Sequence, residues 1–298
     1  MKITKILIGT LILASTIISC TNGNNKADGY GNFEATETTI SAENSGKLTL
    51  FTVEEGKILK KGEYVGLIDT IQLALKKEQL LVSKNTIISK SKGVLSQINV
   101  LKAQLKTATI SKNRIENLLK ENAATQKQLD DIDGQIDVLN QQIRSVEIQN
   151  APVVNELKNV DVQISQLEDL LQKSNIINPI NGTVLVKYAE PNEITSFGKP
   201  LYKIADLSTM QLRVYVGEKQ LSSIKIGQEV TVKIDANEEM KNFKGTISWI
   251  ASEAEFTPKI IQTKEERINL VYAVKINVKN DGSLKIGMPA EMWINTTK

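Results

Sequence analysis

Between residues 126 and 173, apolar residues recur at alternating intervals of three and four. One member is polar, and the series runs Leu129, Ile132, Ile136, Leu139, Ile143, Val146, Asn150, Val153, Leu157, Val160, Ile164, Leu167 and Leu171. A repeat of 3.5 residues predicts a left-handed coiled coil. Pro152 lies inside the series without changing its register, so we expect a kink or local opening of the helix there.

A second apolar series covers residues 71–121. Its members recur every seven residues, at Leu73, Leu80, Ile87, Val94, Leu101, Ala108 and Ile115. Their apolar neighbours change along the helix from Ala74, Leu81, Ile88 and Leu95 to Ile98, Leu105 and Leu119. This change predicts a stripe that drifts around the helix. Each arm is about 75 Å long at 1.5 Å per residue. A polar junction near residues 121–124 separates them, which predicts an antiparallel hairpin.

Charge supports pairing of the two arms within one chain. Residues 71–121 contain ten Lys and Arg residues and three Glu residues, a net charge of +7. Residues 126–173 contain four Lys and Arg residues and nine Asp and Glu residues, a net charge of −5. Either run alone could be a solvated helix face, but opposite signs favour an intramolecular hairpin over two separate dimeric zippers. Because an exposed ion pair contributes only about 0–1 kcal/mol, the charges select the pairing more than they stabilise it.

The sequences flanking the two arms repeat each other. Residues 45–69 and 181–206 align at a constant offset of 136 residues, which matches Gly46 with Gly182, Ile58 with Ile194, Gly62 with Gly198 and Ile68 with Ile204. Each copy predicts short strands separated by turns. Neither copy could bury its apolar face alone, so the two are expected to form one small β-sandwich.

The spacing of glycines and apolar residues in these copies resembles the biotinyl and lipoyl carrier fold. In carrier enzymes a tight hairpin bearing a modified lysine joins the two halves, whereas here the joining site reads Asp69-Thr70-Ile71-Gln72. We therefore expect no covalent cofactor. A carrier remains the alternative from the enzyme class, and a lipoyl or biotin adduct in the mass spectrum would reveal it.

The first twenty residues have the pattern of a lipoprotein signal peptide. Two lysines precede an apolar stretch, Ile6–Ile18, which is shorter than the roughly 20 apolar residues of a membrane-spanning helix. The stretch leads to Ser19-Cys20, which resembles a bacterial lipobox with Cys20 as the lipidated residue. Residues 21–29 are polar and predict a flexible tether. An ordinary signal peptide, or a short anchor helix with an incidental cysteine, is the alternative.

Composition excludes several classes of function. The chain has no histidine and one cysteine, which removes His-dependent catalysis, His-ligated metal sites, internal disulfides and cysteine-clustered zinc. Its 37 basic and 34 acidic residues give a net charge of +3, which provides no overall footprint for nucleic acid. Carboxylate-only chemistry is not excluded.

The order of these features resembles the HlyD-like membrane fusion proteins, the periplasmic adaptor subunits of tripartite efflux and secretion pumps. The resemblance implies an α+β chain: a lipoyl-like split β-sandwich interrupted by a coiled-coil hairpin and followed by a C-terminal β-barrel. The expected division is 1–20 signal peptide, 21–29 tether, 30–70 first half of the lipoyl-like domain, 71–174 hairpin, 175–206 second half and 207–298 barrel.

The resemblance also implies a function and partners. These are a non-enzymatic periplasmic adaptor without cofactor or metal, lipid-anchored to the inner membrane of a Gram-negative bacterium, assembled as a homo-oligomeric ring, and bound to an inner-membrane transporter and a TolC-like outer-membrane duct. Residues 256–259 and 262–267 resemble a loop of adaptors that serve ABC-type exporters. An adaptor of a proton-driven pump, or a structural coiled-coil envelope lipoprotein, remains as an alternative.

Three residues near the hairpin junction fit a docking motif of this family. Adaptors that bind TolC-like ducts carry Arg, Leu and Ser at the hairpin tip with the spacing R-x3-L-x6-S. Arg114, Leu118 and Thr125 match it, with Thr in place of Ser. Arg114 and Leu118 would share one helix face, and Thr125 would cap the returning helix. Alternatively, Leu118 packs in the seam, Arg114 is a solvated charge and Thr125 is a helix cap only.

Overall fold

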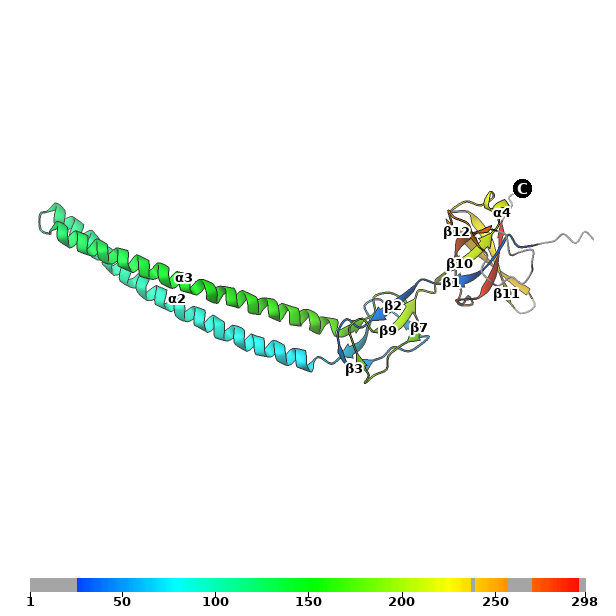
Figure 1. The fold of residues 1–298 in the computed structure, drawn as a ribbon, viewed down its shortest axis with the longest axis horizontal. Coiled ribbons are helices and arrows are strands. Elements are labelled where there is room, and N and C mark those ends of the chain that lie inside the picture. The colour runs from blue at the N-terminus through cyan, green and yellow to red at the C-terminus, as the bar shows by residue number, and fades with distance from the viewer. Residues whose placement is uncertain (1–25, 237–238, 257–269, 295–298) are drawn as a thin grey trace, which may run out of the picture. The chain divides into compact units, whose positions relative to one another are not determined.

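The computed structural model describes residues 26–236, 239–256 and 270–294. It has the expected α+β architecture: a β-sandwich carrying a long helical hairpin, and a β-barrel (Figure 1). The chain divides into two compact units, Glu37–Ala205 and a second unit formed by the chain up to Thr36 together with Asp206 onward. Among the described helices, none has an apolar stretch of the length that a bilayer requires.

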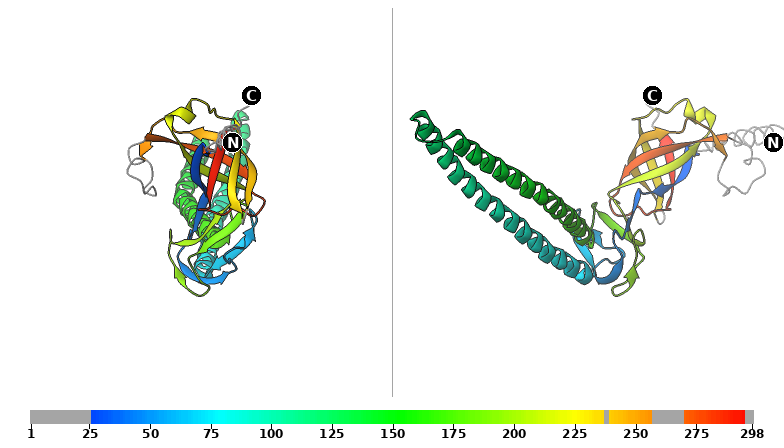
Figure 2. Two further views of the ribbon diagram at one scale, coloured as in Figure 1. Left: turned by 90° about the vertical axis from the view of Figure 1, so that its right-hand side faces the viewer. Right: turned by 60° about the vertical axis from the view of Figure 1, so that its left-hand side comes forward.

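The hairpin consists of α2 (Ile71–Lys120) and α3 (Gln126–Lys173), which run antiparallel beside each other (Figures 1 and 2). All thirteen positions of the series on α3 are buried or half-buried. Seven of them are buried: Leu139, Ile143, Val146, Val153, Val160, Ile164 and Leu167. The coiled-coil prediction for this arm is therefore confirmed.

The drifting stripe predicted for α2 is wrong. Ala74 and Leu95, two of its supposed members, are exposed. The seam instead continues at the regular spacing of three and four through half-buried polar residues: Lys77, Lys84, Ser91 and Lys112. The lysines can occupy the seam because their aliphatic stems cover apolar surface while the ammonium groups reach carboxylates on α3. Their partners are Glu168, Asp161 and Asp133, at N–O distances of 2.8, 2.8 and 2.6 Å.

The β-sandwich has two four-stranded sheets, and each contains strands from both sides of the hairpin. The first sheet has the order β2 (Glu37–Ser41), β9 (Pro200–Ala205), β7 (Gly182–Lys187) and β4 (Ile58–Leu59). The second has the order β6 (Asn175–Ile177), β5 (Tyr64–Ile68), β3 (Gly46–Phe51) and β8 (Ile194–Thr195). Exchanging the two sequence copies converts one order into the other. The internal repeat is thus a structural repeat, and it extends to the pair β2 and β6.

Equivalent turns of the two copies contain glycine for the same reason. Gly62 has φ of 84° and Gly198 has φ of 80°, and a Cβ at either position would meet no atom within 4 Å. Steric crowding therefore does not require glycine at these sites. The left-handed backbone conformation does, because residues with a Cβ adopt it at a cost.

A buried polar network joins the two halves of the sandwich. Asn178 is fully buried, and its side-chain amide donates to the carbonyls of Lys60 and Ile180 at 2.9 and 2.6 Å. Its carbonyl oxygen accepts from the Tyr202 hydroxyl at 3.0 Å. Burial raises the pKa of Tyr202 well above its ordinary value. Tyr202 therefore stays a neutral donor at this site.

The second unit is a closed barrel in which each strand pairs with the next. The order is β10 (Thr209–Val216), β1 (Gly29–Glu34), β15 (Pro289–Ile294), β11 (Glu229–Ala236), β12 (Glu239–Ile250) and β14 (Leu270–Lys279), and β14 pairs back with β10. β13 (Glu255–Phe256) pairs antiparallel with the beginning of β14, and the short helix α4 (Glu218–Leu221) follows β10. Inward residues such as Phe33, Leu212 and Ile276 fill the core.

The boundary expected at residue 30 differs in the structure. Strand β1 had been grouped with the β-sandwich, but it pairs with β10 and β15 in the barrel. Phe33 is 0% exposed there and belongs to the barrel core. The barrel is therefore also split along the chain, because its first strand precedes the whole unit Glu37–Ala205 and its other strands follow that unit.

Candidate functional site: the hairpin tip

The tip is a tight turn between two long helices. Residue 122 is the only non-glycine of the described hairpin with a left-handed backbone, at φ of 53°, and it is an asparagine, which tolerates this conformation. The amide of Asn122 donates to the carbonyl of Leu119, and that of Ala123 donates to Leu118 at 2.8 Å. These two bonds form a Schellman motif, which satisfies the last carbonyls of α2.

Thr125 begins α3 with a full capping box. Its hydroxyl accepts from the amide of Gln128, and the Gln128 side-chain oxygen accepts from the amide of Thr125 at 2.8 Å. The expectation that Thr125 caps the returning helix is confirmed. The residue remains exposed at the end of the hairpin.

Arg114 and Leu118 lie on the last turns of α2, one helical turn apart. Leu118 is 38% exposed, so the seam does not cover it. Arg114 is exposed, and no ion pair or side-chain hydrogen bond holds it within the described ranges 26–236, 239–256 and 270–294. The tip thus presents an unpaired guanidinium, an apolar side chain and a hydroxyl within a short stretch of surface.

The turn is held in place just below the tip. Lys112 forms ion pairs with Asp133 at 2.6 Å and with Glu116 at 3.8 Å. The hydrogen bond to Asp133 raises the pKa of Lys112, and the Coulombic attraction of the two carboxylates acts in the same direction. Since the pair joins α2 to α3, it fixes the register from which the tip residues project.

The two outer edges of the hairpin carry no charge over most of their length. The outermost position of each heptad, opposite the seam, is exposed throughout. On α2 it is occupied by Leu75, Val82, Ser89, Ser96, Ala103 and Ile110. On α3 it is occupied by Gly134, Gln141, Ile148, Asn155 and Val162. A coiled coil surrounded only by water places charged or polar residues at this position. Here five of these positions instead hold large apolar side chains that are exposed in a single hairpin: Leu75, Val82, Ile110, Ile148 and Val162.

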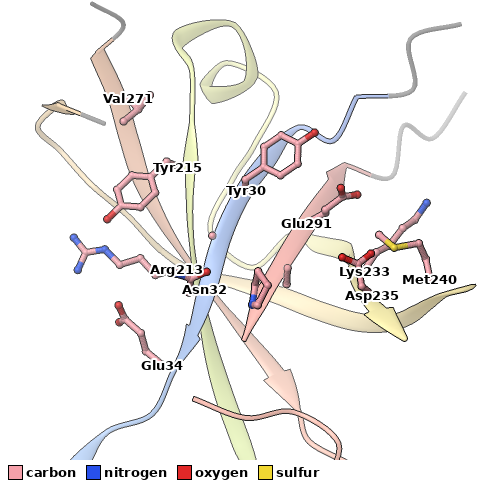
Figure 3. A pocket seen from close by; sticks show the side chains of 13 residues that line it. Tyr30, Asn32, Glu34, Arg213, Tyr215, Lys233, Asp235, Met240, Val271 and Glu291 are labelled. Atoms are coloured by element: carbon pink, nitrogen blue, oxygen red, sulfur yellow. The ribbon is translucent and has the colours of Figure 1, made fainter. Parts of the chain in front are cut away.

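The barrel has a groove of about 590 Å³ on its outer wall (Figure 3). Arg213 and Tyr215 lie on one side of β1, and Glu291 and Lys233 on the other. Arg213 is held by Glu255 at 3.2 Å, and the Lys233 nitrogen lies 4.1 Å from the centre of the Trp293 ring. Because charges of both signs line the groove, and Arg213 and Lys233 have partners of their own, the groove indicates no single class of ligand.

The chain segment that holds the lysine hairpin in carrier proteins is here the start of a helix. The carboxylate of Asp69 accepts a hydrogen bond from the amide of Ile71 at 2.9 Å, an Asx turn that leads into α2. Two other predictions, the lipidated Cys20 and most of the loop at 256–267, lie outside the described residues.

Comparison with known proteins extends this description. No family model matches the chain. The UPF0194 membrane proteins YbhG of Salmonella gallinarum and Salmonella arizonae are each 33% identical over 126 residues, which is 42% of this chain and 38% of theirs. The chain thus aligns with well under half the length of these curated relatives.

Solved structures match over nearly the whole chain. The crystal structure of MacA from Actinobacillus actinomycetemcomitans superposes with a TM-score of 0.55 and 21% identity, covering 89% of this chain and 76% of that one. The membrane fusion protein Spr0693 from Streptococcus pneumoniae gives 0.50 and 17%, covering 90% and 98%. At these identities the likeness concerns the fold alone, and the chain has the fold that these two structures share.

Proposed function

We propose that this chain is a periplasmic adaptor that links an inner-membrane transporter to an outer-membrane exit duct for efflux or secretion. The observation that carries the proposal is the hairpin inserted between two halves of one β-sandwich, on a chain that also forms a barrel. The likeness to MacA and to a membrane fusion protein supports it. In this function the chain holds partners together and catalyses no reaction, and it needs no cofactor or metal.

Within this proposal the tip binds a TolC-like duct. Arg114 donates its guanidinium to carboxylates or carbonyls of the duct, Leu118 fills an apolar depression and Thr125 adds a hydroxyl contact. The support is geometric, since all three residues are exposed and the tip turn is held by its own hydrogen bonds. A fixed turn lowers the entropy lost on docking.

The ring proposed for this adaptor is supported by the uncharged edges. The outermost positions of α2 and α3 face away from each other, so the two edges lie on opposite sides of one hairpin. The α2 edge of one copy would then meet the α3 edge of the next, in a heterologous contact that closes a ring. The opposite net charges of the two arms, +7 and −5, favour this arrangement over contacts between like edges.

The anchor and the class of transporter complete the proposal. Lipidation of Cys20 would hold the chain at the inner membrane, and Cys20→Ala should abolish palmitate labelling because no other residue can accept the thioether. An ABC-type exporter is the proposed partner, on the resemblance of residues 256–267, with a proton-driven pump as the alternative. The neighbouring genes distinguish these two partners. Genes for an ATPase and a permease would indicate an ABC-type exporter, and a gene for a large proton-driven pump would indicate the alternative.

The experiment that tests the tip is substrate export in cells that carry Arg114→Asp, Leu118→Ser or Thr125→Ala. Export should fall at least about tenfold for Arg114→Asp, since a charge left unpaired at a buried contact is costly. It should fall as much for Leu118→Ser, which removes the apolar side chain from the proposed contact. Arg144→Asp is the matched control, because Arg144 is an exposed arginine of α3 away from the tip. Protein level and helicity are measured alongside.

Export at the wild-type rate by all three folded variants would show that these residues are ordinary surface and cap. The alternative hypothesis is a structural coiled-coil envelope lipoprotein. Such a protein would retain its fold and its anchor, but it would capture no transporter in a pull-down from detergent extracts.

Disulfide trapping tests the ring separately from export. Counting along both helices from the Lys84–Asp161 ion pair places Val82 of α2 level with residue 163 of α3, next to Val162. Val82→Cys with Val162→Cys should therefore cross-link neighbouring copies into a ladder. Val82→Cys with Val138→Cys, at different levels, should not. A dimer formed by Val82→Cys alone would indicate that like edges meet.

A further inference from the structure

The packed seam of the hairpin is interrupted at one level between its base and its tip. Nearer the base, one cluster of buried side chains contains Ile87, Val153, Val160 and Ile164. Nearer the tip, a separate cluster contains Ile98, Ile143 and Val146. Between them the seam positions are polar, and the Ser91 hydroxyl donates to the side-chain oxygen of Asn150 at 3.1 Å. Apolar packing, which resists separation and bending of the helices, is therefore missing at this level.

Helix α3 loses a backbone hydrogen bond at the same level. Pro152 lies inside the helix and has no N–H group, so the carbonyl of Ile148 has no helical donor. The proline ring also crowds the preceding turn. Sharp helix bends occur most often at such positions.

Helix α2 has a glycine within about one helical turn of this level. Gly93 follows Ser91 by two residues and Pro152 follows Asn150 by two residues, and the Ser91 and Asn150 side chains are hydrogen-bonded to each other. A Cβ at Gly93 would meet no atom within 4 Å, so packing does not require a glycine there. Its physical effect is on the backbone, since glycine stabilises a helix less than alanine does.

We propose that Gly93, Pro152 and the Ser91–Asn150 pair form a hinge at which the whole hairpin bends. A pair of packed helices bends only where both backbones yield and where the seam between them can adjust. Each of these conditions is met at this level, by a different residue. The proposal concerns motion within the hairpin and does not depend on which proteins bind its ends.

The position of the hinge makes a small bend large at the tip. About 27 residues separate Gly93 from the end of α2, which is about 40 Å at 1.5 Å per residue. A bend of about 20°, the size at which a helix counts as kinked, moves the tip by about 14 Å. The base is fixed meanwhile, because β5 and β6 pair with each other directly beside the two helix ends. The hinge thus lets Arg114, Leu118 and Thr125 follow a partner that moves while the β-sandwich stays in place.

Pulsed electron–electron double resonance measures the distribution of distances between two spin labels, and the width of that distribution tests the hinge. Labels at Ser83→Cys and Lys106→Cys span the proposed hinge on α2, and labels at Gln97→Cys and Lys120→Cys span the same number of residues beyond it. All four positions are exposed. The full chain is used with Cys20→Ser, so that only introduced cysteines carry labels.

We expect the distribution that spans the hinge to be broader than the control, and Gly93→Ala with Pro152→Ala to narrow it to the control width. Amide exchange around residue 93 should also slow by about fivefold in Gly93→Ala, whereas Gly134→Ala, another glycine with open space around it, should leave that region unchanged. Both substitutions favour helix, so loss of folding does not confound the result. Equal widths in the unsubstituted chain, or a broad distribution that persists in the double variant, would overturn the hinge.

Discussion

The β-sandwich and the hairpin belong to one compact unit but are stabilised in different ways. Leu48, Leu59 and Leu201 of the sandwich are all 0% exposed, and one cluster of buried side chains fills the space between its sheets. In the hairpin only three of the fifty residues of α2 are buried, and even these remain 4–6% exposed. The sandwich therefore depends on its own core, whereas the hairpin mainly provides surface.

The difference explains how one unit can combine a fixed base with an extended arm. The hairpin leaves the sandwich between two strands that pair directly, since Leu67 of β5 lies opposite Asn175 of β6. The amide of Ile68 also donates to the carbonyl of Ser174 at 2.9 Å. Both helix ends are thus held by one strand pair. A rigid sandwich orients the arm, and the arm can keep polar seam positions that a small core could not tolerate.

The largest expected effect comes from the core of the sandwich. Leu201→Ala should lower the free energy of unfolding by about 3 kcal/mol, because a fully buried leucine leaves a cavity that two packed sheets cannot close. Leu157→Ala, at a half-buried position of the hairpin seam, should cost clearly less. Urea denaturation followed by hydrogen exchange of β9 and α3 measures the two. Equal losses would contradict the contrast between core and surface.

The next effect concerns the polar network that joins the halves of the sandwich. Asn178→Ala should cost about 2 kcal/mol, because it leaves two backbone carbonyls and the Tyr202 hydroxyl without a partner in a buried site. Asn181→Ala is the matched control. The side chain of Asn181 also bonds to the backbone, where it accepts from the amide of Lys61 at 2.8 Å, but Asn181 is exposed and water can replace it. Thermal unfolding of both variants gives the comparison, and a control as destabilised as Asn178→Ala would refute the role of burial.

The sequence predicted most of the architecture where apolar periodicity was unbroken. On α3 the spacing identified every seam position, and on the flanks the offset of 136 residues identified the two halves of the sandwich. The seam spacing is a local pattern, and the offset compares the sequence with itself. Both can therefore be recognised without knowing which residues are in contact in the folded chain. The capping role of Thr125 followed from its place before a helical pattern for the same reason.

The remainder depended on contacts that a pattern does not encode. The seam of α2 was misplaced because Lys77, Lys84 and Lys112 occupy it, and a lysine looks solvent-exposed until its partner on α3 is known. Strand β1 was misassigned because its partners, β10 and β15, lie about 180 and about 260 residues further along the chain. Similarly, Gly93 carries no signal of its own, and its significance comes from lying two residues from Ser91, whose partner Asn150 lies two residues from Pro152.

A smaller effect is expected at the tip, where stability and docking can be separated. Thr125→Ala removes the side-chain half of the capping box and should cost about 1 kcal/mol. Thr125→Ser keeps the hydroxyl and should restore most of that stability. Thermal unfolding followed at the helix signal measures both variants. A loss of several kcal/mol would mean that the tip organises the hairpin, in conflict with the view that the hairpin is mainly surface.

The smallest effect is expected from the ion pairs of the seam, and it shows what the seam lysines contribute. Lys84 and Asp161 are 35% and 47% exposed at their side chains, so solvent screens their attraction and the coupling should be only about 0.5 kcal/mol. Lys84→Met keeps the apolar stem that covers the seam and removes the charge, whereas Lys84→Ala removes both. We therefore expect Lys84→Met to change stability by less than about 0.5 kcal/mol and Lys84→Ala to be the more destabilising of the two. A double-mutant cycle with Asp161→Asn measures the coupling at low and high salt. If Lys84→Met were as harmful as Lys84→Ala, the charge and not the stem would hold the seam, and the register of the hairpin would rest on its ion pairs.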